Sequence, residues 1–188
     1  MKTVLIITAL LFLAGSNVSG QNFKADPANS VLGWTGKKVS GKHFGKINLN
    51  SGEFTISNNM IVSGKFTIDM NTMTTEDLTG GMAEKLIGHL KSDDFFSAAK
   101  FAYSTLEITG SEPFTNNEAK VAGRLTIKGI TQPISFLVRR SGNVFTSTVT
   151  VDRTLYNIRY GSGKFFQNLG DNMIDDNFIL EVKIAAVQ

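Results

Sequence analysis

The chain of 188 residues contains no cysteine. Disulfide bonds, thiolate catalysis and cysteine-based zinc sites are therefore excluded, and the fold must be stabilised by its apolar core. Histidine is almost as rare, with only His43 and His89. A zinc site would need both histidines and a carboxylate from distant parts of the chain, so we expect no metal site. No serine lies in a Gly-x-Ser-x-Gly elbow, and no histidine follows one in triad order, so the sequence carries no α/β-hydrolase signature.

Charge of one sign and long hydrophobic runs are also scarce. The net charge is +3, and the basic residues are scattered, so we expect no nucleic-acid partner. The one long apolar run, Val4 to Ala14, is shorter than the roughly 20 residues that span a bilayer. Lys2 precedes the run and the small residues Val18-Ser19-Gly20 follow it, as in a secretory signal peptide. We therefore expect a signal peptide over 1–20, cleavage near Gly20 and one domain over 21–188; an N-terminal membrane anchor is the alternative.

Two short motifs suggest ligands but do not match their patterns. Gly161-Ser162-Gly163-Lys164 looks like the end of a phosphate-binding P-loop. Ile158 stands where that motif needs its first glycine, and Phe165 stands where serine or threonine must follow the lysine. The aspartates between 171 and 176 lack the alternating ligands and the later glutamate of an EF-hand. The first segment is interpreted as an irregular loop that brings Lys164 near an anionic group or as a plain solvated turn, and the second as a solvated loop.

Alternation of apolar and polar residues dominates the chain and indicates strands with one apolar face. In the stretch 60–70, for example, even-numbered residues are apolar or glycine, whereas Lys65, Thr67 and Asp69 are polar. Turn signals such as Asn58-Asn59 and Lys128-Gly129 separate the strands. We predict strands at 30–38, 43–49, 52–57, 60–70, 101–109, 119–128, 133–140 with 143–151, and 176–187.

One region departs from this period. Met82, Leu86 and Leu90 recur at helical spacing within the segment from Thr79 to Ala99. About eight antiparallel strands hide their edges best by closing into a barrel. The interior of such a barrel is either filled by side chains or holds one small ligand. We therefore predict an all-β, elongated antiparallel barrel with a helical segment at one end.

Four sequence blocks resemble the YceI-like family of secreted lipid-binding proteins. They are HLKSDDFFSAAKF (89–101), GRLTIKGITQPISF (123–136), VDRTLYNIRYGSGKFF (151–166) and the turn from Val39 to Gly45. One departure is Phe101-Ala102, where the family usually has Tyr-Pro. The resemblance implies a lipocalin-like barrel, export to the periplasm or beyond, and a polyisoprenoid or other long-chain amphiphile held inside.

From the resemblance and the apolar strand faces we expect a binding protein that transports, stores or sequesters such a lipid. The expected bound molecule is the lipid itself, without a cofactor. Two alternatives stay open: an enzyme that acts on a bound amphiphile through His43 or Arg153, and a stress-linked structural barrel with a filled core. Transient membrane contact and the oligomeric state are left open. The candidate cavity residues are Trp34, Phe54, Phe66, Ile68, Met70, Leu86, Leu90, Phe95, Phe136, Phe178 and Leu180.

The two ends of the barrel carry separate expectations. The segment from Met82 to Ala99 is expected to close one end and to gate it, with a static plug as the alternative. The other end is expected to select the head group through the irregular segment after residue 152. Arginine and lysine suit a phosphate, and tyrosine hydroxyls suit a quinone carbonyl. Alternatively, Arg153 pairs with Asp152 or Asp176 and fixes the loop. The head-group candidates are His43, Arg153, Tyr156, Tyr160 and Lys164.

Overall fold

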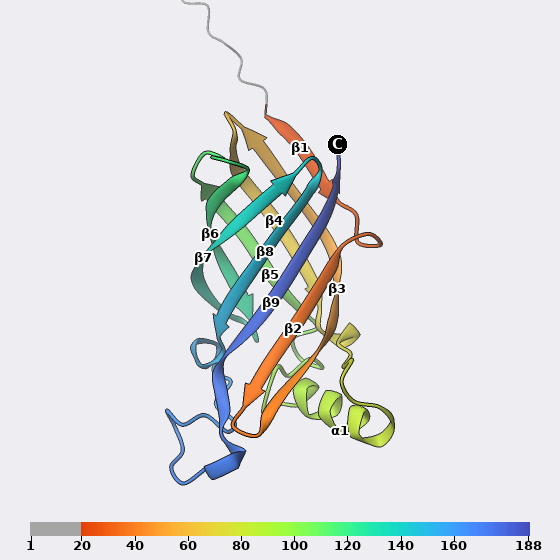
Figure 1. Cartoon of the computed structure of the whole chain (residues 1–188), viewed down its shortest axis with the longest axis vertical. Coiled ribbons are helices and arrows are strands. Elements are labelled where there is room, and N and C mark those ends of the chain that lie inside the picture. The colour runs from red at the N-terminus through yellow and green to blue at the C-terminus, as the bar shows by residue number, and fades with distance from the viewer. Residues whose placement is uncertain (1–19) are drawn as a thin grey trace, which may run out of the picture.

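The computed structural model describes residues 20–188 as an elongated barrel of antiparallel strands (Figure 1). The predicted signal peptide over 1–20 therefore falls, except for Gly20, outside the described residues. The strands are β1 (Gln21–Ala25), β2 (Val31–Lys38), β3 (Gly41–Ser57), β4 (Met60–Asp69), β5 (Tyr103–Ser111), β6 (Glu118–Ile127), β7 (Ile130–Ser141), β8 (Val144–Asp152) and β9 (Ile174–Val187). The helices are α1 (Gly80–Lys91) and the short 3-10 helices η1 (Met70–Thr72), η2 (Arg153–Tyr156) and η3 (Gly170–Asn172).

The sheet closes because β3 pairs with both β2 and β4. From β2 the order runs through β9, β8, β7, β6, β5 and β4 back to β3. β2 lies between β3 and β9 over one stretch of those strands. β1 lies between the same two strands further along. β1 and β2 thus occupy one position in the wall, interrupted by the loop 26–30. The predicted antiparallel barrel of about eight strands is confirmed.

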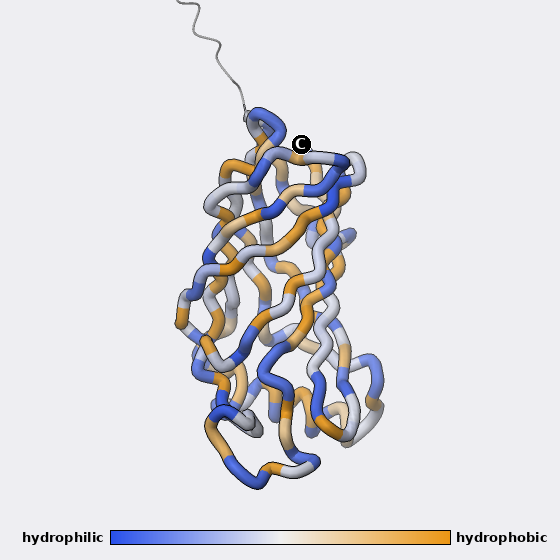
Figure 2. Tube along the Cα trace, turned by 60° about the vertical axis from the view of Figure 1, so that its left-hand side comes forward, coloured by the Kyte–Doolittle hydropathy of each residue, from blue (hydrophilic) through white to orange (hydrophobic). Residues whose placement is uncertain are grey.

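The predicted alternation places one face of each strand in the interior. In β6, every second residue from Ala119 to Ile127 is buried, and the residues that alternate with them face outward. Figure 2 shows the same alternation of hydrophobic and hydrophilic residues along the strands. Burial of these apolar faces is worth about 25 cal/mol per Å² of area removed from water. The period-two pattern therefore determines both the strand register and the position of the core.

Two details of the strand prediction are wrong. The stretches 43–49 and 52–57 form one continuous strand, β3, which passes through a register shift between Leu49 and Ser51. A bulge of this kind bends a strand without ending it, so the polar residues there resembled a turn. The prediction also missed β1, because only Phe23 and Ala25 in this five-residue strand are buried.

The wall has one weak seam, between β7 and β8. The two strands pair only beside their connecting turn, from Arg139–Thr146 to Ser141–Val144, and then diverge. Away from the turn, side chains bridge the strands: Ser147 Oγ donates to the carbonyl of Leu137 at 2.7 Å. A second bridge joins Gln132 Nε2 to the carbonyl of Leu155 at 3.2 Å.

Pro133 fits this seam because proline has no N–H to donate. The N–H of Arg140 donates toward the β6 side, to Asn117, whereas the carbonyl of Leu137 faces β8. Backbone groups alternate in direction along a strand, so the missing N–H of Pro133 falls on the β8 side. Proline is tolerated on such an unpaired edge but not inside a ladder.

One end of the barrel, called the sealed end below, is closed by packed phenylalanines. The Phe23 and Phe54 rings stack with centroids 5.0 Å apart, and Phe145 meets Phe54 edge-on at 4.9 Å. The guanidinium of Arg140 lies over Phe23 and Phe145, with its central carbon 5.7 and 5.5 Å from the ring centroids. Each aromatic pair adds about 0.5–1.5 kcal/mol beyond area burial. This end therefore has a tightly packed closure.

The opposite end, called the helix end, carries α1 (Figure 1). The helix ends at Lys91, and the rest of the predicted helical segment, to Ala99, is a series of turns. Leu86 and Leu90 face the barrel as predicted, but Met82 is 67% exposed and does not belong to the packed stripe. No helix within residues 20–188 is both long and apolar enough to cross a membrane.

Candidate lipid-binding cavity

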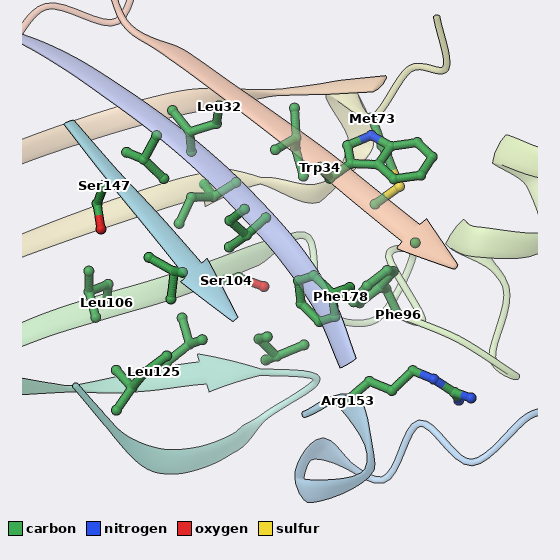
Figure 3. A pocket seen from close by; sticks show the side chains of 18 of the residues that line it. Leu32, Trp34, Met73, Phe96, Ser104, Leu106, Leu125, Ser147, Arg153 and Phe178 are labelled. Carbon is green, nitrogen blue, oxygen red and sulfur yellow. The ribbon is translucent and has the colours of Figure 1, made fainter. Parts of the chain in front are cut away.

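The barrel interior contains an apolar cavity of about 260 Å³. It extends from Phe54 and Phe145 beneath the sealed end to Phe96 and Phe178 at the helix end. Figure 3 shows side chains from β2, β5, β6 and β9 converging on it. The residues predicted from sequence to line a cavity all border it: Trp34, Phe54, Phe66, Ile68, Met70, Leu86, Leu90, Phe95, Phe136, Phe178 and Leu180. Their contact with a ligand stays a prediction.

The polar side chains in the cavity wall are mostly bonded to the protein. The indole N–H of Trp34 donates to the carbonyl of Thr74 at 2.9 Å. Ser104 Oγ lies 3.1 Å from the sulfur of Met70, and Ser147 Oγ donates to the Leu137 carbonyl. These side chains therefore present chiefly carbon surface to the interior, which suits an apolar ligand.

The segment with Arg153, Tyr156, Tyr160 and Lys164 was predicted at the end opposite α1, and this prediction is wrong. The guanidinium of Arg153 lies 5.6 Å from the ring centroid of Phe95, just beyond α1. The Tyr160 ring meets His89 of α1 edge-on at 4.5 Å. The chain leaves β4 at the helix end and crosses the barrel four times in β5 to β8, so it returns to the same end.

Arg153 is almost fully committed to the protein. Its side chain is 2% exposed and donates to four backbone carbonyls, those of Ile158, Tyr160, Ile174 and Asp175, at 2.9–3.1 Å. Asp176 Oδ1 lies 3.6 Å from Nη2. Burial lowers the Arg153 pKa, and the nearby aspartates oppose that shift. These contacts favour the alternative in which Arg153 fixes the loop over the head-group role.

Arg153 borders the cavity, whereas the other candidates in this segment lie outside the cavity wall. Lys164 Nζ bonds Asp152 at 2.8 Å and approaches Asp176 at 3.5 Å, and the bond to Asp152 raises the Lys164 pKa. Tyr156 is buried away from the cavity, and burial raises its pKa to about 12. Tyr160 is half-exposed and packs on His89. The segment is thus held beside α1 by its own hydrogen bonds and ion pairs. Neither Arg153 nor Lys164 is left as a free cation.

His43 borders the cavity at the helix end and is held by Asp77. The distance from His43 Nδ1 to Asp77 Oδ2 is 2.7 Å. Asp77 Oδ1 accepts from the N–H of Phe44 at 3.0 Å and from Thr75 Oγ1 at 2.7 Å. Burial opposes ionisation of Asp77, but these hydrogen bonds outweigh it and lower its pKa to about 2. The pair ties the loop before α1 to β3.

Gly45 shows how closely that loop packs. A Cβ at this position would lie 2.0 Å from the carbonyl oxygen of Thr74, so only glycine fits. The N–H of Thr74 donates to Lys46, and the N–H of Glu76 donates to Phe44. The base of α1 is therefore anchored, although the helix itself is loosely packed.

His89 was missed as a site residue in the sequence analysis. It lies in the last turn of α1 and borders the cavity. Its Nε2 is buried, and no protein group in residues 20–188 hydrogen-bonds to it. Leaving such an atom unpaired costs about 1–3 kcal/mol. The signal in the sequence was its spacing of three and one residues from Leu86 and Leu90, which places all three on the same side of the helix.

No cation site accompanies the cavity within residues 20–188. Nowhere in that range do three or more His, Asp or Glu side chains come together in a way that could hold a metal ion. The features of the cavity that a ligand can meet are therefore its apolar wall, its rim at the helix end and the His89 imidazole.

The fold and cavity define a closed antiparallel barrel with an apolar interior. Within the described residues, no cluster of His, Asp or Glu side chains that could hold a metal ion adjoins this interior. A family model for the YceI-like domain matches residues 23–186, and the chain belongs to that family. A UPF0312 protein of Shewanella sp. strain ANA-3 is 27% identical over 135 residues, which are 66% of this chain and 69% of that protein.

Two solved structures share the fold. BcnA of Burkholderia cenocepacia has a TM-score of 0.69 at 18% identity, covering 87% of this chain and 99% of BcnA. A polyisoprenoid-binding domain from Saccharophagus degradans, implicated in plant cell wall breakdown, has a TM-score of 0.58 at 14% identity, covering 87% and 97%. At these identities the likeness concerns the fold of the barrel.

Proposed function

We propose that this protein binds one long-chain amphiphilic lipid, of isoprenoid type, inside the barrel and transports, stores or sequesters it outside the cytoplasm. The observation that carries the proposal is the apolar cavity that joins the phenylalanine closure to the helix end. Membership of the YceI-like family and the likeness to a polyisoprenoid-binding domain support it. The leader-like pattern of residues 1–20 supports export.

The size of the cavity suits a slender tail. Its volume of about 260 Å³ lies just below the usual range for small-molecule sites, which begins at about 300 Å³. Each buried CH₂ contributes about 0.8 kcal/mol, and micromolar affinity needs about 8 kcal/mol. A tail of more than about ten carbons therefore supplies that affinity without a specific polar contact. The tail determines affinity, and polar groups at the rim select the head.

The alternative of an enzyme with His43 or Arg153 as the acting residue is less well supported. Arg153 donates to backbone carbonyls, and Asp77 is the only hydrogen-bond partner of the His43 side chain in residues 20–188. A nucleophile within hydrogen-bond reach of the histidine is the usual mark of such a site. The filled-core alternative is disfavoured by the cavity itself.

Mass spectrometry of an organic extract tests the function, with two matched variants. Leu125→Trp places an indole inside the cavity, whereas Leu137→Trp adds the same ring to the outer face, where Leu137 is exposed. We expect lipid in extracts of the wild type and of Leu137→Trp, and a loss of at least tenfold in Leu125→Trp. Equal lipid in both variants, with both folded, would show that the lipid is not bound in the barrel.

A further inference from the structure

His89 differs from every other buried polar side chain in the cavity wall. Trp34, Ser104, Ser147 and Arg153 each have a partner within the protein. The buried Nε2 of His89 has none among residues 20–188. Asp176 Oδ1 also lacks a hydrogen bond, but it faces Arg153 at 3.6 Å and lies outside the cavity wall. Among the described residues, His89 Nε2 is thus the buried polar atom of the cavity wall that is left for a ligand to pair.

The surroundings of His89 are aromatic. Its ring lies edge-on to Phe95, with centroids 5.2 Å apart, and to Tyr160 at 4.5 Å. A neutral imidazole nitrogen either donates or accepts one hydrogen bond, depending on the tautomer. An alcohol and a carbonyl oxygen therefore both suit it. Such a bond inside apolar surroundings discriminates strongly against a ligand without the oxygen.

The charges near His89 do not suit an anion. The N–H groups of Arg153 point to carbonyls, and Lys164 is bonded to Asp152. Lys37 and Lys38 border the cavity, but they are the exposed last residues of β2, where solvent screens them. A phosphate at the depth of His89 would be buried without a free cation, which is strongly unfavourable.

From this contrast we infer that His89 Nε2 hydrogen-bonds an uncharged oxygen head group, of the alcohol or quinone class, at the helix end of the cavity. The inference rests on the proposed function and specifies its ligand. It orients the lipid with its tail toward Phe54 and Phe145 and its head beneath α1. It also predicts that an isoprenoid alcohol binds more tightly than its phosphate.

The test compares three probes of equal tail: farnesol, farnesyl phosphate and the matching hydrocarbon. Trp34 is the only tryptophan and borders the cavity, so its fluorescence reports binding. The variants are His89→Phe, which keeps an aromatic ring against Tyr160 and Phe95, and His89→Gln, which keeps a polar group. We expect the wild type to prefer farnesol to the hydrocarbon by about tenfold, which corresponds to one buried hydrogen bond.

His89→Phe should bind farnesol and the hydrocarbon equally, with hydrocarbon affinity unchanged, and His89→Gln should restore part of the preference. Because the chain has two histidines, ¹⁵N-histidine spectra give a second readout. Farnesol should shift the His89 imidazole signals, and the hydrocarbon should leave them unchanged.

The outcomes separate this inference from the function on which it rests. A farnesol preference that survives in His89→Phe, or tighter binding of farnesyl phosphate than of farnesol by the wild type, overturns the role of His89 and leaves the lipid-binding function standing. Failure of all three probes to bind the wild type overturns the proposed function itself.

Discussion

The two ends of this barrel are built from the same sheet but packed differently. At the sealed end, Phe23, Phe54 and Phe145 are buried against one another, and β1 is paired on both edges. At the helix end, Leu90 is the only buried residue of α1, Thr79 makes no capping hydrogen bond, and three glycines weaken the helix. We therefore expect a ligand to enter the interior more easily at the helix end than at the sealed end.

The largest effect should follow from breaking the sealed end. Phe23 is 1% exposed and does not border the cavity, so Phe23→Ala removes packing without touching the lipid site. We expect a loss of about 3–5 kcal/mol in the free energy of unfolding, measured by chemical denaturation. The matched change at the helix end, Met82→Ala, should cost less than about 0.5 kcal/mol. Similar costs for the two variants would remove the contrast between the ends.

Arg153→Met tests whether the loop beside α1 is held structurally. The substitution leaves buried carbonyls without a donor, and we expect a loss of about 3 kcal/mol in the free energy of unfolding. Arg153→Lys should rescue little, because lysine cannot reproduce the planar fork of donors. A melting temperature near that of the wild type, combined with lost affinity for farnesyl phosphate, would instead restore Arg153 as a head-group ligand.

Acid should loosen the helix end through Asp77. Its folded-state pKa is about 2, against 3.8 ordinarily, so its contribution is fully present above about pH 4 and is lost as the pH falls through about 2. We expect ionised Asp77 to contribute about 1–2 kcal/mol to the free energy of unfolding, after allowing for solvent screening. Denaturation of the wild type and Asp77→Asn at several pH values measures it. The two proteins should differ at pH 6 and converge near pH 2; parallel curves would contradict the assignment.

Gly88→Ala tests movement of α1 with the smallest effect. A Cβ at Gly88 meets nothing within 4 Å, so the helix should gain about 0.5–1 kcal/mol without a clash. If α1 must loosen before lipid enters, stopped-flow Trp34 fluorescence should show uptake about two- to fivefold slower, with affinity nearly unchanged. A rate equal to that of the wild type would support a static plug.

The sequence predicted most of the barrel because period-two alternation reports burial directly. It predicted the cavity wall for the same reason, since residues such as Phe66, Phe136 and Leu180 lie on inward faces. It failed where the chain direction mattered. The segment after Asp152 was assigned to the wrong end, because the alternation of a strand does not show at which end of the barrel the chain leaves it; β7 and β8 each cross the barrel once and return the chain to the helix end.

The polar part of the site was harder to predict, because residue type does not show whether a side chain already has partners. Arg153 and Lys164 suggested an anion site, but carbonyls and aspartates bond them. The spacing of His89 could have placed it beside Leu86 and Leu90, but not shown that it lacks a partner. Only the folded structure shows its Nε2 buried without a partner among the described residues. Tertiary hydrogen bonds join residues at irregular separations along the chain, so no periodic pattern in the sequence reveals them.

Hydrogen exchange with and without farnesol tests most directly whether the helix end is where the lipid enters and is held. The account predicts that farnesol slows exchange in α1 and in the turns to Ala99, whereas amides around β1 and Phe145 exchange slowly in both states. Exchange in α1 that is the same with and without bound farnesol, or protection that appears mainly at the sealed end, would contradict the assignment of the two ends.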